Sequence, residues 1–174
     1  MRATVLAMTI SLLIGCASMN DALTPSMQVK KDSFDNSTVV IQEPVSSAGS
    51  IKEAWHTLGF SWNQKTPDII YITVGTNGIV NITNVAFNAD GKIISNIKTA
   101  SATTEYGQWS TRRFAMSWDD FQTVANAQLV KMKVSRINDY TVSSFGKERS
   151  GATINSKFPP FIAKVSELRA SIKQ

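Results

Sequence analysis

The chain has 174 residues, with 18 lysines and arginines against 13 aspartates and glutamates, which gives a formal net charge of +5. This length suits one ordinary domain with a buried core. Cys16 is the only cysteine, so an intramolecular disulfide is excluded and packing must stabilise the fold. A charge of this size affects solubility and weak association, and it does not by itself identify a ligand.

The first sixteen residues have the order of a secretory signal. Arg2 forms a short basic region, and residues 3–14 are almost all apolar or small. This run is shorter than the roughly 20 apolar residues that cross a bilayer, but it matches a signal peptide. The sequence Leu13-Ile14-Gly15-Cys16 resembles the lipobox of bacterial lipoproteins. The resemblance implies cleavage after Gly15 and diacylglycerol on the Cys16 sulfur, because a cysteine thiolate is a strong nucleophile.

The residues after Cys16 indicate where such a lipoprotein resides. In Gram-negative lipoproteins an aspartate at that place favours the inner membrane, so Ala17-Ser18 implies the outer membrane, facing the periplasm. The alternatives are the outer face of a Gram-positive plasma membrane, or a cleaved secretory peptide with an incidental cysteine. We expect a signal peptide over 1–15, a lipidated cysteine and tether over 16–25, and a globular domain over 26–174. This location argues against nucleic acid as a partner.

In the first third of the domain, residues 27–31 and 39–41 have the pattern of short strands. Ser50 and Glu53 have the spacing of a capping box, which predicts a helical turn over 51–55 before a strand that ends near Trp62.

Residues 69–99 are rich in β-branched side chains and contain two turn signals, Asn77-Gly78 and Asp90-Gly91. The first dipeptide suits a type I′ hairpin turn, and the second predicts another turn. The pattern predicts a three-stranded antiparallel meander.

In the last third, residues 106–116 predict a strand and Ser117 a helix N-cap, with a helix near 117–127. Alternation predicts a strand over 129–136. We expect another strand over 140–145, then a charged hairpin loop over 146–151 and a short strand over 152–155. Apolar spacing predicts a C-terminal helix over 160–172.

These elements predict a single α+β domain: an antiparallel sheet of about seven to nine strands, with the meander 69–99 at its centre and two helices on one face. The stretch from Phe60 to the C-terminal helix is similar to small envelope proteins of Gram-negative bacteria. That resemblance implies no activity.

His56 is the only histidine, and no spaced carboxylates accompany it as metal ligands. The nearest nucleophile motif, Gly59-Phe60-Ser61-Trp62-Asn63, is one residue short of the G-x-S-x-G elbow, and its histidine lies upstream instead of downstream. We therefore expect a surface or hydrogen-bonded polar histidine, no catalytic or metal site, and no cofactor.

Basic and aromatic residues offer an alternative binding chemistry. Arg112 and Arg113 are adjacent on a strand and so point to opposite faces, whereas Lys131 and Lys133 share one face. The plainer explanation gives these residues no ligand. The arginines then pair with other groups of the protein, and the lysines lie on a strand face exposed to solvent. The sharper hypothesis is contact with an anionic glycan or lipid, with Trp109 as a stacking surface.

The functional expectation is a non-enzymatic outer-membrane lipoprotein, attached through lipid on Cys16, whose periplasmic domain binds another envelope protein. The alternative is a module that binds an anionic envelope glycan or lipid. Its candidate contacts are Trp109, Arg112, Arg113, Lys131 and Lys133.

Overall fold

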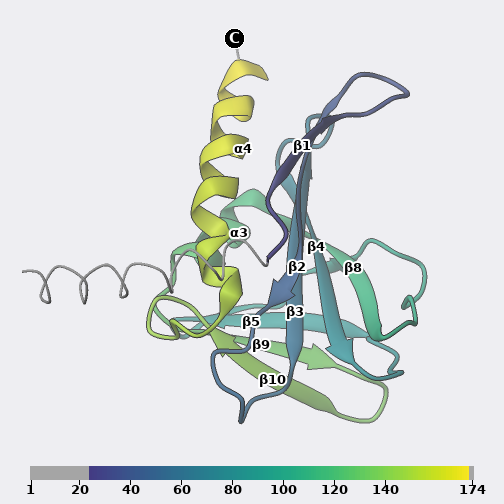
Figure 1. The fold of residues 1–174 in the computed structure, drawn as a ribbon, viewed down its shortest axis with the longest axis vertical. Coiled ribbons are helices and arrows are strands. Elements are labelled where there is room, and N and C mark those ends of the chain that lie inside the picture. The colour runs from purple at the N-terminus through teal and green to yellow at the C-terminus, as the bar shows by residue number, and fades with distance from the viewer. Residues whose placement is uncertain (1–23, 173–174) are drawn as a thin grey trace, which may run out of the picture.

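The computed structural model describes residues 24–172, which form two antiparallel sheets and two helices (Figure 1). The predicted α+β class and single domain are confirmed, but the strands form two sheets, of six and four strands, instead of the one sheet of about seven to nine strands that the sequence predicts. The predicted signal peptide, Cys16 and most of the tether lie outside the described residues. Within the described part of the chain, no helix is long and apolar enough to cross a membrane.

Six strands form the larger sheet, in the order β1-β2-β3-β4-β8-β7. Every neighbouring pair is antiparallel. The strands are β1 (Gln28–Lys31), β2 (Thr38–Ser46), β3 (His56–Asn63), β4 (Ile69–Asn77), β7 (Lys98–Thr99) and β8 (Trp109–Ser117).

Four strands form the smaller sheet, in the order β10-β9-β5-β6. It crosses the lower part of the larger sheet in Figure 1. Its strands are β5 (Asn84–Ala89), β6 (Lys92–Ile94), β9 (Val130–Ser135) and β10 (Tyr140–Phe145).

Alternation of side chains decides which face of each sheet is buried. Ile70, Ile72 and Val74 of β4 are buried, and every second residue of β9 is buried as well. Because successive strand residues point to opposite faces, the residues between them lie on the outer faces of the two sheets. The core therefore forms between the inner faces.

Two helices close the core. Ser117 caps α3 (Trp118–Asn126), and its hydroxyl accepts a hydrogen bond of 3.1 Å from the Asp120 amide, as the sequence predicts. The C-terminal helix α4 (Phe158–Ile172) begins two residues before its predicted start. Both helices cover the inner face of the six-stranded sheet, because Phe60 of β3 contacts an aromatic ring from each, Phe121 at 5.2 Å and Phe161 at 4.6 Å between centroids.

The predicted meander over 69–99 is wrong in its first hairpin. The strand β4 pairs with β3 and β8, and β5 lies in the other sheet. Asn77 continues β4 opposite Trp109, and only Gly78 of the expected turn has a positive φ, of 84°. The Ser110 hydroxyl accepts the Val80 amide at 3.0 Å and helps to hold the irregular link that follows.

The second predicted hairpin is confirmed. Asp90 and Gly91 have φ of 50° and 93°, the two positive values that a type I′ turn requires, and they join β5 to β6. In this protein, turn-forming residues produce a hairpin at Asp90-Gly91, where the two flanking strands pair with each other. They do not produce one at Asn77-Gly78, where β4 pairs with other strands.

Two shorter predictions are also corrected. The strand expected over 152–155 is a 3₁₀ helix, η1 (Thr153–Ser156), so residues 146–151 are not a hairpin loop. Glu53 does not reach back to the Ser50 amide as a capping box requires; its carboxylate accepts hydrogen bonds from Ser144 of β10 instead. Residues 51–53 form a turn, and the strand expected after them is β3.

Candidate functional site

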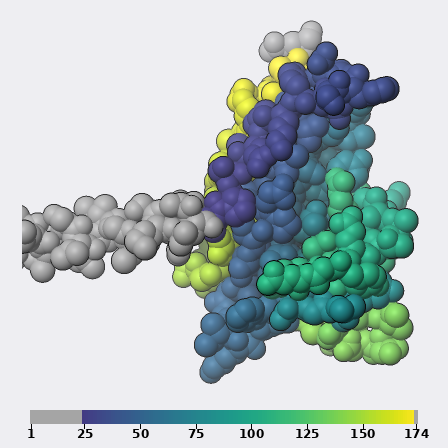
Figure 2. Space-filling view, turned by 45° about the vertical axis from the view of Figure 1, so that its right-hand side comes forward, coloured from purple at the N-terminus to yellow at the C-terminus, as the bar shows by residue number. Residues whose placement is uncertain are grey.

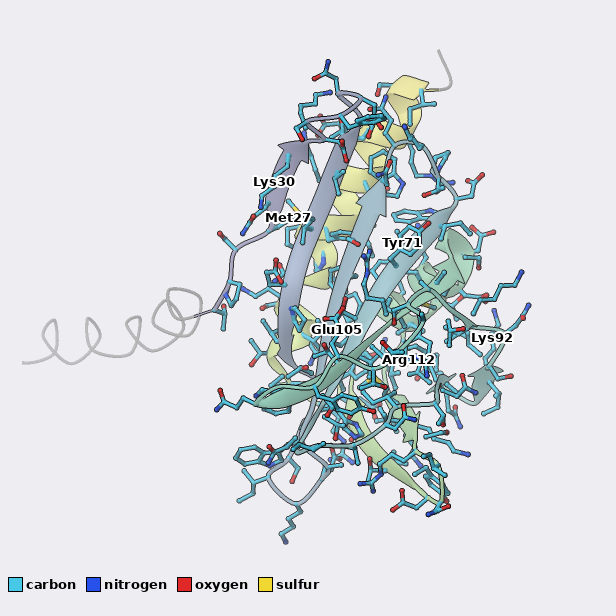
Figure 3. All side chains as sticks on the ribbon, turned by 90° about the vertical axis from the view of Figure 1, so that its right-hand side faces the viewer. Met27, Lys30, Tyr71, Lys92, Glu105 and Arg112 are labelled. Atoms are coloured by element: carbon cyan, nitrogen blue, oxygen red, sulfur yellow. The ribbon has the colours of Figure 1, made fainter. Side chains whose placement is uncertain are left out.

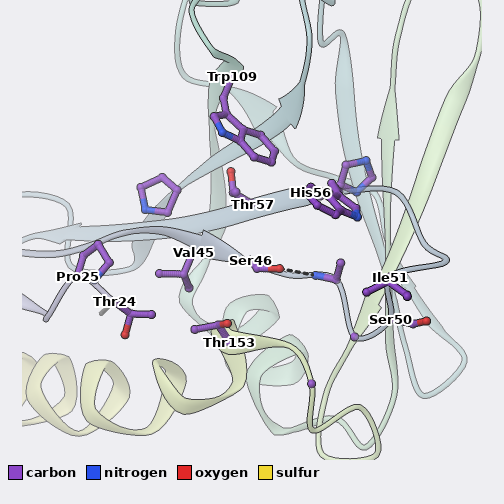
Figure 4. A pocket seen from close by; sticks show the side chains of 15 residues that line it. Thr24, Pro25, Val45, Ser46, Ser50, Ile51, His56, Thr57, Trp109 and Thr153 are labelled. Atoms are coloured by element: carbon purple, nitrogen blue, oxygen red, sulfur yellow. Dashed lines mark hydrogen bonds between the residues drawn. The ribbon is translucent and has the colours of Figure 1, made fainter. Parts of the chain in front are cut away.

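A groove of about 710 Å³ opens at the end of the six-stranded sheet where β2 ends and β3 begins (Figure 4). Its walls come from several parts of the chain: the segment that leads into β1, the end of β2, the loop before β3 with the first residues of β3, the first residue of β8, and residues in and just before η1. The lining residues are Thr24, Pro25, Pro44, Val45, Ser46, Ala48, Gly49, Ser50, Ile51, Trp55, His56, Thr57, Trp109, Gly151 and Thr153.

A β-bulge shapes the first wall. The register between β2 and β3 shifts between Gln42 and Val45, which turns Pro44 toward the groove. Gly59 of β3 allows this close approach, because a Cβ there would lie 2.7 Å from the Pro44 nitrogen. The Gln42 side-chain amide donates a hydrogen bond of 3.1 Å to the carbonyl of Pro25 and holds the entering segment against β2 (Figure 2).

The loop between β2 and β3, residues 47–55, is fixed along the free edge of β10. The Gly49 amide donates to the Ser144 carbonyl at 2.8 Å, and the Ala54 amide to the Val142 carbonyl at 3.3 Å. Partial burial opposes ionisation of Glu53, but hydrogen bonds from the Ser144 hydroxyl and amide outweigh it and lower the pKa of Glu53. A charged Glu53 therefore fastens the loop in place.

Aromatic and aliphatic side chains stand exposed around the groove. Trp55 is 59% exposed and Ile51 is 88% exposed, although both belong to the anchored loop. Trp109 is half-buried on the outer face of β8. Exposed apolar groups gathered at one concave site are typical of binding surfaces.

No aspartate, glutamate, lysine or arginine is among the described residues that line the groove. The polar side chains of the lining are those of serine, threonine, His56 and the two tryptophans. Because a charged ligand would receive no opposite charge here, the lining favours an apolar or uncharged one.

His56 is 1% exposed and both of its ring nitrogens are engaged. Nδ1 lies 3.0 Å from the Ser143 hydroxyl and Nε2 lies 2.9 Å from the Thr141 hydroxyl, so the ring ties β3 to β10. Burial, with a smaller effect from the charge of Arg136, lowers the pKa of His56 to about 4. The predicted hydrogen-bonded polar histidine is confirmed, and the ring is neutral at neutral pH.

The two arginines lie on opposite faces of β8, as predicted. The Arg112 guanidinium donates to the carbonyls of Ile82 at 2.6 Å and Ala102 at 3.3 Å, so it holds two neighbouring loops (Figure 3). Arg113 lies on the outer face with its guanidinium carbon 5.4 Å from the centre of the Tyr71 ring. These contacts are the structural pairing that the sequence offered as the plainer explanation, with carbonyls and a ring as partners.

Lys131 and Lys133 are exposed on the outer face of the four-stranded sheet. The Lys133 ammonium lies 4.3 Å from the centre of the Tyr140 ring. The five predicted contacts thus occupy different surfaces, and only Trp109 lines the groove. Sequence reasoning did not single out Ile51 or Trp55 for this groove, although large apolar side chains on a short segment before a strand were a usable signal.

Among residues 24–172, no group of three or more histidine, cysteine, aspartate or glutamate side chains could hold a metal ion. Comparisons with protein-family models, with curated proteins and with solved structures find no match. The functional argument therefore depends on the groove.

Proposed function

We propose that this chain is a non-enzymatic outer-membrane lipoprotein, held by lipid on Cys16, whose periplasmic domain binds an apolar segment of another envelope protein. The observation that carries the proposal is the uncharged groove, lined by Trp55 and Trp109, at the point where the chain enters the domain. Tryptophans in such positions commonly supply much of the energy of protein–protein binding.

The end of β2 favours an extended peptide as the ligand. The strand β1 pairs with β2 only over Thr38–Ile41, whereas β2 continues to Ser46. Its last residues, Pro44, Val45 and Ser46, therefore border the groove. An extended segment lying there could use backbone hydrogen bonds for affinity and place alternate side chains against the tryptophans.

The side chains around His56 support a binding role over a catalytic one. A general base needs a free nitrogen that can reach a substrate. Both nitrogens of this ring lie within hydrogen-bond distance of buried or half-buried hydroxyls of β10, and Ser143 is fully buried.

The test is photocrosslinking in cells of the lipidated protein. In one strain a photoreactive phenylalanine analogue replaces Trp109. In a control strain the same analogue replaces Phe34, which lies in the hairpin at the opposite end of the sheet. We expect one dominant protein to be captured from position 109 and not from position 34. The Cys16→Ser form should lose that capture, because it is no longer held at the membrane.

Capture of no protein above background at position 109 would refute the peptide ligand. Equal capture at both positions would refute the groove as its site. Only the first result, no capture of protein, would favour the second candidate function, binding of an anionic glycan or lipid.

The second candidate is motivated by Lys131 and Lys133, which present two exposed ammonium groups on one sheet face next to Tyr140. Attraction between exposed charges is screened by salt. Binding to lipopolysaccharide or peptidoglycan should therefore weaken steeply as salt is added, and salt-independent binding would contradict this candidate.

A further inference from the structure

We infer that the end of the six-stranded sheet that carries the groove rests on the surface of a phospholipid bilayer. The inference rests on the lipid anchor of the proposed function, and it does not depend on which ligand enters the groove. It concerns the loops that project from this end and the place where the chain enters the domain.

The strand registers bring these loops together. Ser46 of β2, Thr57 of β3 and Gly75 of β4 are successive partners across the sheet, and Asn77 of β4 lies opposite Trp109 of β8. The loops that follow β2 and β4 therefore leave from the same end. An isolated bridge between residues 105 and 111 folds the turn before β8 to this end as well.

Each of these three loops exposes large apolar side chains. They are Ile51 and Trp55 between β2 and β3, Ile79 after β4, and Tyr106 before β8. Lys52 is exposed beside Ile51. This composition suits a membrane–water interface, where tryptophan and tyrosine rings lie at the level of the headgroups and lysine reaches lipid phosphates.

The position at which the chain enters the domain indicates that the bilayer is the partner of this surface. Thr24 and Pro25 line the groove, so the described chain begins at the same end of the sheet. Eight residue steps separate Cys16 from Thr24. Fully extended, they reach at most about 29 Å. A lipid on Cys16 would therefore keep this end near the bilayer, with the β1–β2 hairpin at the far end (Figure 1).

The experiment uses the lipidated protein purified from cells and reconstituted into vesicles of phosphatidylethanolamine and phosphatidylglycerol. Half of the samples carry bromine on the acyl chains, which quenches tryptophan fluorescence at short range. Trp55 should be quenched, because it is 59% exposed at the proposed contact, whereas Trp62 and Trp118 are buried in the protein. The Trp55→Phe variant should lose most of the bromine-dependent decrease in emission.

A matched control places a tryptophan at the opposite end. Phe34 is 94% exposed in the β1–β2 hairpin, so Phe34→Trp, made together with Trp55→Phe, reports on the far end without disturbing the core. Its bromine-dependent decrease should be no larger than that of Trp55→Phe alone, in which half-buried Trp109 is the remaining tryptophan of the groove. Because the vesicles contain no other protein, a protein partner cannot produce the quenching of Trp55.

The possible failures are distinguishable. A protein that does not float with the vesicles, or whose N-terminal peptide lacks the mass of the lipid, overturns the anchor and with it this inference. A protein that floats but shows equal quenching before and after Trp55→Phe overturns only the membrane contact. Stronger quenching at position 34 would show the reverse orientation and also overturn it.

Discussion

Stability of the domain should fall as the pH is lowered from 7 to 5, because of one buried histidine. The folded state lowers the pKa of His56 to about 4, from an ordinary value of 6.5. Between these values the unfolded chain binds a proton that the folded chain excludes, so the free energy of unfolding rises with pH in this window. The contribution is fully present above pH 6.5 and is lost as the pH falls toward 4.

The magnitude follows from the size of the shift. Each pKa unit corresponds to about 1.4 kcal/mol, so the whole window amounts to roughly 3 kcal/mol. Integrating from pH 7 to pH 5 gives a loss of about 2 kcal/mol. His56 is the only histidine of the chain, so no other side chain of that type titrates there.

Urea unfolding of the native chain and of His56→Gln at pH 7, 6 and 5 tests this reasoning. Glutamine does not titrate, and its amide can still meet one of the two hydroxyls. At pH 7 the variant should lose about 1 kcal/mol for the lost hydrogen bond, and its stability should then change by less than about 0.5 kcal/mol down to pH 5. If both proteins lose stability equally over this range, the buried neutral histidine is not the cause.

Three further substitutions, two of them paired with a control variant, test the packing, and urea unfolding measures all five. Phe60→Ala should lower the free energy of unfolding by about 3–5 kcal/mol, because it removes the ring between the six-stranded sheet and both helices, whereas Phe34→Ala should change it by less than about 0.5 kcal/mol. Arg112→Ala should cost about 1–3 kcal/mol, since two loop carbonyls lose a charged donor, and Arg113→Ala, which loses only an exposed contact with a ring, should cost less than about 1 kcal/mol. Gly59→Ala should cost about 1–3 kcal/mol, because its Cβ would overlap the backbone of the bulge in β2. Equal effects of the paired variants, or a neutral Gly59→Ala, would contradict the packing described.

Local sequence signals predicted most of the secondary structure. The alternation over β9, the Ser117 cap of α3 and the apolar spacing of α4 are each decided by residues close in the chain. The α+β class follows from the sum of such elements. The structural role of the arginines could also be anticipated, because adjacent residues on a strand point to opposite faces.

The pairing of strands could not be obtained in the same way. Asn77-Gly78 has the composition of a hairpin turn, yet Asn77 remains in β4 opposite Trp109 of β8, 32 positions later. Pairing β4 between β3 and β8 buries its apolar residues Ile70, Ile72 and Val74 in the core, and this burial outweighs the turn preference of Asn77-Gly78. Which strands pair therefore depends on contacts between distant parts of the chain, which local sequence patterns do not reveal.

Some features of the candidate site could be predicted from the sequence, and others are formed only by folding. The sequence alone supplied the lipobox, the lone histidine without metal ligands, and Trp109 as an aromatic residue to consider for binding. Only the tertiary structure joined Trp109 to Ile51 and Trp55 around one groove and placed the lysines on another sheet. Signals of the first kind depend on neighbouring residues, whereas a groove is formed by loops that become neighbours only when the strands pair.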